Sequence, residues 1–323
     1  MEKGLILLSF SEHFLLPEFK GELEAKGAGR QVLVTKDPKE IEPLLEKIEI
    51  GIGEVPFALV QRMPNLKWLQ LSWAGADFLQ NIPALKEKPF MLTSASGMNR
   101  QPMAEHLFTM LLSWNRCISI AFEAKKKRQW ARPNMSQLTV LGGKSMLIIG
   151  YGAIGEAVAK AALGFNMQVT GIRNNISKGS GLDEVKLEEA SKLHSLLPQA
   201  DYVVNILPFT PDTRHFVGAA ELALMKKSAL YLSIGRGGTT DEAALIEALS
   251  AKRIAGALLD VTETEPLPES SPLWDLDNVM ITAHYAGIDR NNSRLAMDIA
   301  LENLRRYNSG QALINLVDKN RGY

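Results

Sequence analysis

Short apolar runs alternate with helix-length amphipathic segments along almost the whole 323-residue chain. The runs that we predict to be strands are residues 4–9, 31–35, 67–72, 90–94, 145–149, 168–172, 202–206, 229–234, 256–261 and 279–282. Strands this apolar are typically buried on both faces, and the helical segments between them are typical of β-α-β units. The pattern therefore predicts an α/β protein built from Rossmann-like, doubly wound parallel sheets.

A long helical pattern from Pro102 to roughly Gln129 divides the strands into two series. Proline suits the first turn of a helix, and apolar residues recur behind it at helical spacing. One further amphipathic helix is predicted over residues 293–308, where no strand series is left for it to join. We therefore expect a discontinuous first domain, residues 1–101 plus 287–323, with a second domain, residues 102–286, inserted in it.

The composition argues against several classes of partner. Lys plus Arg and Asp plus Glu each total 36, so the formal net charge is zero and no nucleic-acid footprint is expected. No window approaches the roughly 18 apolar residues of a membrane span, and the N-terminal apolar run is too short for a signal core. Cys117 is the single cysteine, which rules out an internal disulfide and a CxxC metal site. We expect a cytoplasmic protein without a metal, a nucleic-acid partner or a membrane partner.

Residues 150–155 read GYGAIG, directly after a predicted strand and at the start of a strong helical pattern. In a dinucleotide-binding loop, the glycine at Gly150 makes the turn, Gly152 lets the backbone approach a pyrophosphate, and Gly155 allows close packing of helix and strand. The N–H groups at the helix start, around Ala153 and Ile154, then face the phosphates. A glycine-rich turn without a ligand is the alternative, but the flanking strand and helix favour a dinucleotide site.

The end of the next predicted strand bears on the choice of cofactor. An NAD site normally carries Asp or Glu there, about 20 residues after the glycines. This chain carries Arg173 and Asn174, and no carboxylate follows until Asp183. The missing acid removes a repulsion of the 2′-phosphate, and Arg173 offers that phosphate a bidentate cation. The sequence favours NADP, with NAD possible; the alternative is that Arg173 is an ordinary surface residue.

Three further side chains with suitable chemistry follow predicted strands, whose carboxyl ends bind ligands in open α/β sheets. Arg236 can grip a carboxylate and polarise the carbonyl next to it. His284 can supply or take a proton, and Glu265 beside it would favour the charged imidazolium and orient the ring. Each residue also has a structural alternative: a helix cap for Arg236, a solvated loop acid for Glu265 and a core histidine for His284. Spacing alone leaves both interpretations open.

Several segments occur in the order found in the D-isomer-specific 2-hydroxyacid dehydrogenases, which the chain resembles over nearly its whole length. These segments are residues 71–77 (LSWAGAD), 150–155, 207–213 (LPFTPDT), 235–237 (GRG), 259–261 (LDV), 265–268 (EPLP), 271–274 (SPLW) and 282–284 (TAH). Within the family the chain is most similar to the bacterial glyoxylate/hydroxypyruvate reductases, on residues 73–77, 97–98 and 317–323.

The resemblance implies an oxidoreductase that passes hydride between NAD(P)H and a small 2-oxo or 2-hydroxy acid. It implies catalytic roles for Arg236, Glu265 and His284, with Arg236 also binding the substrate. Other implied contacts are the backbone amides of Ala74, Gly75 and Ala76 with the substrate carboxylate, Asp260 with the nicotinamide carboxamide, and Leu207, Pro208 and Ile234 with the cofactor. The first expected domain would then bind substrate and the second would bind the dinucleotide.

The family resemblance also implies a homodimer formed through the cofactor domain. The apolar helix around residues 107–114 is a candidate surface, unless it lines the domain core instead. Two other functions stay open: an NAD-dependent dehydrogenase of another 2-hydroxy acid, and a cofactor-sensing binding protein similar to transcriptional corepressors. The substrate side chain, the physiological direction and the oligomeric state are not determined by the sequence.

Overall fold

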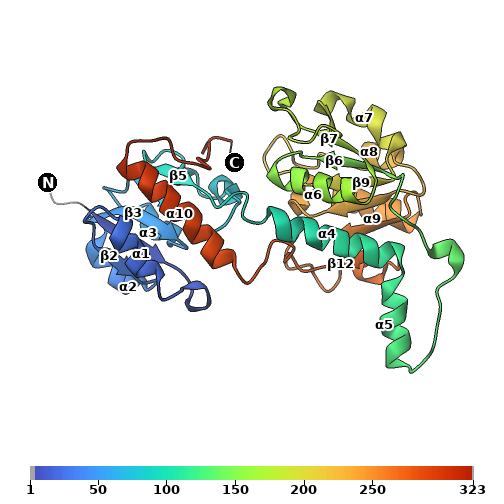
Figure 1. The fold of residues 1–323 in the computed structure, drawn as a ribbon, viewed down its shortest axis with the longest axis horizontal. Coiled ribbons are helices and arrows are strands. Elements are labelled where there is room, and N and C mark those ends of the chain that lie inside the picture. The colour runs from blue at the N-terminus through green and yellow to red at the C-terminus, as the bar shows by residue number, and fades with distance from the viewer. Residues whose placement is uncertain (1–3, 322–323) are drawn as a thin grey trace. The chain divides into compact units, whose positions relative to one another are not determined.

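The computed structural model describes residues 4–321 of the chain. The chain forms two compact units, one made of the segments Met1–Asn99 and Asp289–Tyr323 and the other of Arg100–Ile288. In each unit a parallel sheet lies between layers of helices (Figure 1). The predicted α/β class with two doubly wound parallel sheets is therefore confirmed.

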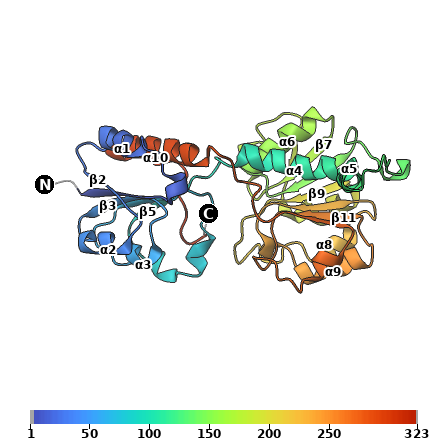
Figure 2. The ribbon, with the colours of Figure 1, turned by 90° about the horizontal axis from the view of Figure 1, so that it is seen from below.

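The first unit contains strands β1 (Leu5–Ser9), β2 (Val32–Val34), β3 (Ile48–Gly53), β4 (Trp68–Gln70) and β5 (Met91–Thr93). All neighbours are parallel, in the order β2-β1-β3-β4-β5, which is a doubly wound order. Helices α1 (Phe19–Lys26) and α10 (Asn292–Asn308) cover one face, and the short helices α2 (Pro38–Ile41) and α3 (Phe57–Val60) cover the other (Figure 2).

The strands of the second unit are β6 (Ser145–Ile149), β7 (Gln168–Ile172), β8 (Lys186–Glu188), β9 (Tyr202–Asn205), β10 (Leu230–Ser233), β11 (Gly256–Leu259) and β12 (Val279–Ile281). They are parallel in the order β12-β11-β10-β9-β6-β7-β8. The chain runs outward from β6 to β8 and then returns to β9 on the other side of β6. Ligands of open α/β sheets bind at the carboxyl ends beside such a switch point.

Helices α4 (Arg100–Asn115) and α6 (Ala153–Gly164) cover one face of the second sheet, and α8 (Ala219–Leu224) and α9 (Glu242–Ser250) cover the other (Figure 2). The short helix α7 (Leu193–Leu196) packs its Leu193 into the same core as α8 and α9. Helix α5 (Ile118–Lys126) projects from the body of this unit (Figure 1).

Each strand predicted from the sequence has a counterpart, whereas β3 and β8 were not predicted. Strand β3 reads IEIGIG, and its glycines and glutamate break the continuous apolar pattern. Gly51 is nevertheless suited to its place, because a Cβ there would lie 3.0 Å from the Leu69 side chain. Strand β8 is a three-residue edge strand with no buried residue, so it carries little apolar signal.

The single helix predicted from Pro102 to about Gln129 is wrong, because the structure contains two helices there. Pro102 lies in the first turn of α4, where its missing N–H costs nothing. Helix α4 ends at Asn115, and Cys117 then adopts a left-handed backbone with φ of 51° before α5 begins. A left-handed residue cannot continue an α-helix, so the chain changes direction at Cys117.

The apolar face of α4 belongs to the core of the second unit. Leu107 and Leu111 are fully buried and share a core with Val158, Ala159 and Ala162 of α6. The Trp114 ring lies against Gly256, where an added Cβ would come within 2.7 Å of it. The apolar side chains of residues 107–114 therefore pack mainly into the core of this unit, which is the alternative given for this segment, whereas Thr109 is exposed.

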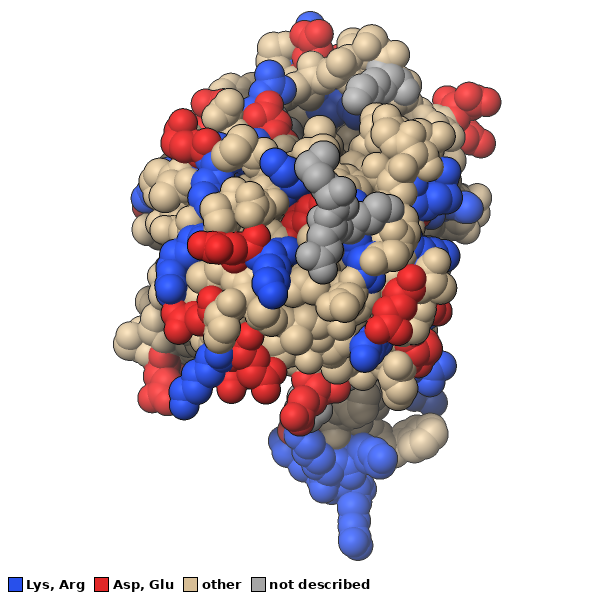
Figure 3. All heavy atoms as spheres, turned by 90° about the vertical axis from the view of Figure 1, so that its left-hand side faces the viewer, with Lys and Arg blue, Asp and Glu red and all other residues tan. Residues whose placement is uncertain are grey.

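Both signs of charge are intermixed over the side of the first unit that Figure 3 shows. Some of the charged side chains of this unit form ion pairs. Examples are Arg294 with Glu22 at 2.9 Å and Arg305 with Glu302 at 2.9 Å. Within residues 4–321, no helix combines the length and the apolar character needed to cross a lipid bilayer.

Helix α10 is held to the first unit by an apolar core, by the Arg294–Glu22 ion pair and by a hydrogen bond from Tyr307 to the Arg30–Glu49 pair. Its Met297 and Leu304 are fully buried in a core with strand residues such as Trp68. At its end, the Tyr307 hydroxyl donates to Glu49 Oε1 at 2.9 Å, and Arg30 donates to both oxygens of that carboxylate at 2.9 and 3.1 Å. Chiefly because of the Arg30 hydrogen bonds, the pKa of Glu49 lies below its ordinary value.

We predict that Glu49→Gln destabilises the first unit by about 1–2 kcal/mol at neutral pH, because charge-assisted hydrogen bonds are lost. A folded-state pKa below the unfolded value stabilises above the unfolded pKa and loses this effect as pH falls through the folded pKa. The difference from wild type should therefore be full at pH 7 and shrink below about pH 4.5. Urea unfolding, with hydrogen exchange of the α10 amides, measures it.

Glu46→Gln is the matched control, because Glu46 is exposed and lies three residues earlier in the chain. Its substitution should change stability by less than about 0.5 kcal/mol. A Glu49→Gln protein as stable as wild type at pH 7, or a difference that persists undiminished at pH 3, would contradict this account of how α10 is held.

Candidate functional site

The glycine-rich loop after β6 lies at the switch point of the second sheet. Gly150 has φ of 97°, and a Cβ there would come within 2.9 Å of the backbone of Ile206, which follows β9. A Cβ at Gly155 would lie 3.2 Å from the Gly150 carbonyl oxygen. The turn and the packing of α6 on the sheet therefore both depend on these two glycines.

Gly152 differs from its two neighbours, because nothing in the protein requires a glycine there. Its backbone is extended, with φ of −114° and ψ of −156°, and a Cβ would meet no atom within 4 Å. The residue caps the start of α6, a twelve-residue helix that begins with Ala153 and Ile154. An open glycine before a helix N-terminus suits the close approach of a pyrophosphate, so the loop fits a dinucleotide.

Arg173 follows β7 directly and is half-buried. Its Nη1 donates to the Gly179 carbonyl oxygen at 3.2 Å, which lays the side chain along the loop after β7. Asn174 is exposed, whereas Asn175 caps the following turn by accepting from the Ser177 N–H at 3.0 Å and from its hydroxyl at 2.6 Å. Arg173 and Asn174 therefore remain the candidates for contact with the ribose end of a cofactor.

The residues predicted to flank the cofactor follow β9 and β10. Leu207 is half-buried, Pro208 is exposed and Ile234 is buried. The Leu207 N–H donates to Asn205 Oδ1 at 3.1 Å, and a Cβ at Gly235 would lie 2.8 Å from the Leu207 carbonyl oxygen. The loops after these two strands are thus packed backbone against backbone.

Arg236 lies between two glycines that the packing requires. Its backbone is extended, and its Nη1 donates to the Gly235 carbonyl oxygen at 3.0 Å. At Gly237, a Cβ would come within 1.8 Å of the Thr262 carbonyl oxygen. The loop that carries Arg236 therefore touches the loop after β11, three residues before Glu265.

Glu265 and His284 form a direct pair, 2.6 Å from Oε2 to Nδ1, with 35% and 45% of their side chains exposed. The second carboxylate oxygen accepts the Thr262 N–H at 3.1 Å, which aims Glu265 at the ring. His284 is thus neither a buried core histidine nor alone, and Glu265 is not merely solvated. Because Nδ1 faces Glu265, Nε2 remains without a protein partner in the described part of the chain and is the nitrogen that can exchange a proton with a ligand.

Asp260 lies under the His284 turn with 1% of its side chain exposed. Its Oδ1 accepts from the Thr282 hydroxyl at 2.6 Å and from the Tyr285 N–H at 3.1 Å, and its Oδ2 accepts from the Ala286 N–H at 3.0 Å. In this structure the carboxylate therefore holds the turn. Its expected contact with the nicotinamide carboxamide stays a prediction.

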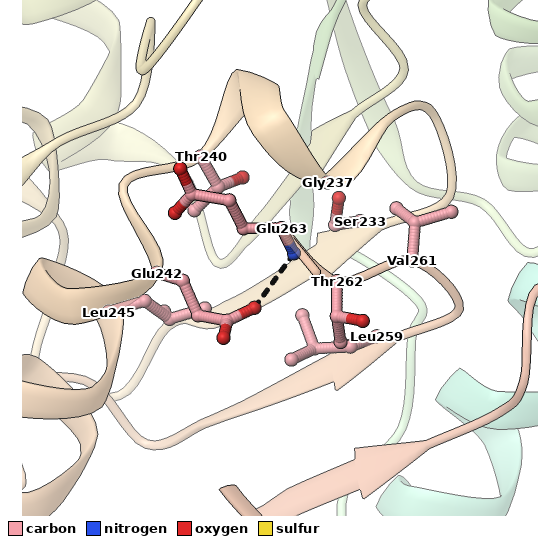
Figure 4. A pocket seen from close by; sticks show the side chains of 9 residues that line it. All are labelled: Ser233, Gly237, Thr240, Glu242, Leu245, Leu259, Val261, Thr262 and Glu263. Carbon is pink, nitrogen blue, oxygen red and sulfur yellow. Dashed lines mark hydrogen bonds between the residues drawn. The ribbon is translucent and has the colours of Figure 1, made fainter. Parts of the chain in front are cut away.

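A small cavity lies beneath the Arg236 loop, between β10, β11 and the start of α9 (Figure 4). Its lining includes Gly237, Thr240 and Glu242, and the Glu263 N–H donates to Glu242 Oε2 at 2.8 Å across it (Figure 4). The space of about 10 Å³ suits a single water molecule and is far too small for a dinucleotide.

The loop predicted to bind the substrate carboxylate belongs to the first unit and follows the carboxyl end of β4. Ala74 and Gly75 are half-buried and Ala76 is buried. Among the described residues, none accepts a hydrogen bond from the backbone N–H groups of these three. Successive N–H groups of this kind suit an anion.

Two residues near the site were not predicted from the sequence. His106 of α4 and Thr282 both approach the Asp260 carboxylate, at 3.6 Å for His106 Nε2 and 2.6 Å for Thr282 Oγ1. A histidine on the inner face of a helix gives no signal of its own, because its partner lies more than 150 residues away in the chain. In residues 4–321, no cluster of three or more His, Cys, Asp or Glu side chains is arranged to hold a metal ion.

Comparison with known proteins agrees with this architecture. Residues 108–286 match the family model of the D-isomer specific 2-hydroxyacid dehydrogenase, NAD binding domain. Glyoxylate/hydroxypyruvate reductase B of Enterobacter sp. (strain 638) is 34% identical over 274 residues, covering 83% of each chain. The D-3-phosphoglycerate dehydrogenase of Methanocaldococcus jannaschii is 32% identical over 284 residues, 86% of this chain, and this chain spans about half of that longer protein, 53%.

A solved structure is similar over both units. The D-isomer specific 2-hydroxyacid dehydrogenase of Xanthobacter autotrophicus Py2, in complex with NADPH and MES, superposes with a TM-score of 0.83 at 29% identity. The match covers 99% of this chain and 100% of the other. The chain therefore belongs to the D-isomer specific 2-hydroxyacid dehydrogenase family, an oxidoreductase family, and carries its NAD binding domain.

Proposed function

We propose that this protein reduces a small 2-oxo acid of the glyoxylate or hydroxypyruvate kind and prefers NADPH to NADH. The observation that carries the proposal is the Glu265–His284 pair, which leaves Nε2 available at the carboxyl edge of the sheet that holds the dinucleotide loop. The similarity to a glyoxylate/hydroxypyruvate reductase supports the substrate class, and a solved relative in complex with NADPH supports the cofactor.

The proposed reaction divides its work among three side chains. The nicotinamide, when bound, supplies the hydride that the carbonyl carbon receives. Arg236 binds the substrate carboxylate and draws electron density from the neighbouring carbonyl. His284 donates its Nε2 proton to the carbonyl oxygen, so that the 2-oxo acid becomes the 2-hydroxy acid. Glu265 holds the ring through Nδ1 and stabilises the charged imidazolium before the transfer.

The remaining contacts are proposals of the same kind. The N–H groups of Ala74, Gly75 and Ala76 are further donors to the substrate carboxylate, so residues 1–101 plus 287–323 are proposed as the substrate-binding domain. Residues 102–286 are proposed as the dinucleotide-binding domain. The glycine loop with Ala153 and Ile154 would hold the pyrophosphate. Leu207, Pro208 and Ile234 would flank the cofactor, and Asp260 would face the nicotinamide carboxamide.

The preference for NADPH follows from charge at the end of β7. Arg173 and Asn174 stand where an NAD site carries an acid that bonds the ribose hydroxyls. The Arg173 guanidinium donates to the Gly179 carbonyl oxygen, and it has several more N–H donors that a 2′-phosphate could use.

We also propose that the protein is a cytoplasmic homodimer. Helix α5 and the segment after it carry a series of exposed apolar side chains: Phe122 at 64%, Trp130 at 94%, Met135 at 86% and Val140 at 65%. Apolar surface of this extent on a projecting element is typical of a protein interface. The one cysteine, Cys117, is unpaired, as suits a reducing compartment.

The dimer proposal predicts that Phe122→Ser combined with Trp130→Ser yields a monomer in light scattering coupled to size exclusion. Both changes remove apolar area from the proposed interface, and neither residue belongs to a buried core. Phe165→Ser, at an exposed apolar residue after α6, serves as the control and should leave the mass unchanged. A wild-type protein that elutes as a monomer at micromolar concentration would reject the proposal.

For the proton donor, His284→Asn should lower kcat for 2-oxo acid reduction by about 10²–10⁴-fold, the range that positioned acid–base groups contribute. NADPH binding, followed by fluorescence, should be unaffected, because His284 is separate from the glycine loop. His194→Asn is the control, since His194 pairs with Glu221 on the surface at 2.7 Å. Retention of most of kcat in His284→Asn would remove His284 from the mechanism.

For the cofactor, wild-type kcat/KM with glyoxylate or hydroxypyruvate should favour NADPH by about ten- to hundredfold, which corresponds to about 1.5–3 kcal/mol of charge-assisted hydrogen bonding to Arg173. Arg173→Asp should raise KM for NADPH strongly and KM for NADH far less, because a carboxylate repels the 2′-phosphate. Arg173→Lys, which keeps the charge, should retain part of the preference. Equal or better use of NADH by the wild type would show that Arg173 does not select the cofactor.

A further inference from the structure

We propose that His106 of helix α4 is a positioning residue for His284, and that it acts through the buried pair of Asp260 and Thr282. The inference rests on the proposed function, in which His284 is the proton donor. His106 is not one of the proposed catalytic residues Arg236, Glu265 and His284. Helix α4 carries none of the other residues in the proposed mechanism.

The turn that carries His284 is held almost entirely by Asp260. The Asp260 carbonyl oxygen accepts the His284 N–H at 2.8 Å. Its carboxylate accepts the next two N–H groups, of Tyr285 at 3.1 Å and Ala286 at 3.0 Å, and the Thr282 hydroxyl at 2.6 Å. The Asp260 side chain, which is 1% exposed, thus binds three groups of the segment 282–286.

His106 completes this arrangement from the other side. Its Nε2 lies 2.9 Å from Thr282 Oγ1 and 3.6 Å from Asp260 Oδ1, and 14% of the side chain is exposed. The Thr282 hydroxyl donates its single proton to Asp260, so its oxygen accepts from His106 and Nε2 must carry the hydrogen. The ring also meets Tyr285 edge-on, with centroids 5.0 Å apart and planes at 85°.

The backbone of His284 makes this support necessary. Its φ is 53°, a left-handed conformation that a residue with a side chain adopts only where its surroundings impose it. Glu265 restrains the ring of His284 but not its backbone. The backbone depends on Asp260, and the direction of the Asp260 carboxylate depends on Thr282 and His106. His106 therefore determines how precisely Nε2 of His284 is placed.

The alternative is that His106 only satisfies a buried polar group and stabilises the fold. Four variants separate the two roles. His106→Leu removes the donor at similar size, His106→Gln keeps an N–H donor, and His194→Leu is the surface control. Thr282→Val removes the bridging hydroxyl while conserving shape.

In steady-state kinetics with NADPH and glyoxylate, His106→Leu should lower kcat by about ten- to hundredfold, as expected for a misplaced catalytic group. The KM for NADPH should change far less than kcat, because the glycine loop and Arg173, which are proposed to hold the phosphates of the cofactor, lie outside this arrangement. His106→Gln should recover part of the loss, and His194→Leu should match wild type. In a His284→Asn background, His106→Leu should cause no further loss. A kcat within twofold of wild type in His106→Leu, or an undiminished loss in the His284→Asn background, would overturn the proposal.

A second measurement does not need turnover. Imidazole-selective ¹H–¹⁵N NMR, with His284 assigned from the spectrum of His284→Asn, reports the ring and its bond to Glu265. His106→Leu and Thr282→Val should shift or broaden the His284 ring signals, whereas His194→Leu should leave them in place. Unchanged His284 signals in a folded His106→Leu protein would overturn the positioning role. If the wild type turns over no 2-oxo acid, the proposed function fails, and the NMR comparison still decides whether His106 positions His284.

Discussion

Contact of backbone against backbone at the carboxyl edge of the second sheet is the constraint on which the rest of the site depends. The loops after β6 and β9 meet at Gly150, those after β9 and β10 meet at Gly235, and those after β10 and β11 meet at Gly237. At each of these places a Cβ would come within 3 Å of the neighbouring backbone. No side chain fits between these loops, so the distances between them are fixed by direct contact of their backbones. The candidate binding and acid–base groups are carried on these loops.

The glycine loop after β6 and the His284 turn after β12 both lie at this edge, and the protein stabilises them in different ways. At the glycine loop, the protein provides N–H groups at the start of α6 and an open face at Gly152, and no side chain fills that face. At the His284 turn, the protein instead uses a buried carboxylate to hold a left-handed residue in place. A dinucleotide needs room and donors, whereas a proton donor needs a precise direction, so the two solutions suit the two tasks.

Apolar runs predicted most of the sheets because a parallel strand between two helical layers must be apolar on both faces. Burial does not need a continuous apolar run in β3, which contains glycines, or in the short edge strand β8, so neither strand was predicted. The left-handed residue Cys117 separates α4 from α5 although the helical pattern of the sequence continues through it. Helical periodicity reports which face is apolar and says nothing of whether the backbone turns.

The candidate site was predictable to the extent that its residues follow strands. Carboxyl ends of parallel strands share one edge, so Arg236, Glu265 and His284 were expected at that edge. Only the family resemblance implied that they act together, and the Glu265–His284 pair agrees with it. Contacts made from a helix face, such as that of His106 with Thr282, follow no such rule, because the sequence does not state how a helix is rotated over a sheet.

Close packing also connects the glycine-rich loop after β6 with the loop after β7 that carries Arg173. Tyr151, between the first two glycines, packs its ring on Gly171 of β7, where a Cβ would come within 2.3 Å of it. Its hydroxyl donates to the Ser180 carbonyl oxygen at 3.1 Å, next to Gly179, which accepts from Arg173. Burial raises the pKa of Tyr151 to about 12, so the hydroxyl keeps its proton and remains a donor at physiological pH. The turn proposed to bind the phosphates and the loop proposed to select the cofactor therefore pack against each other, and a change at Gly171 would disturb both.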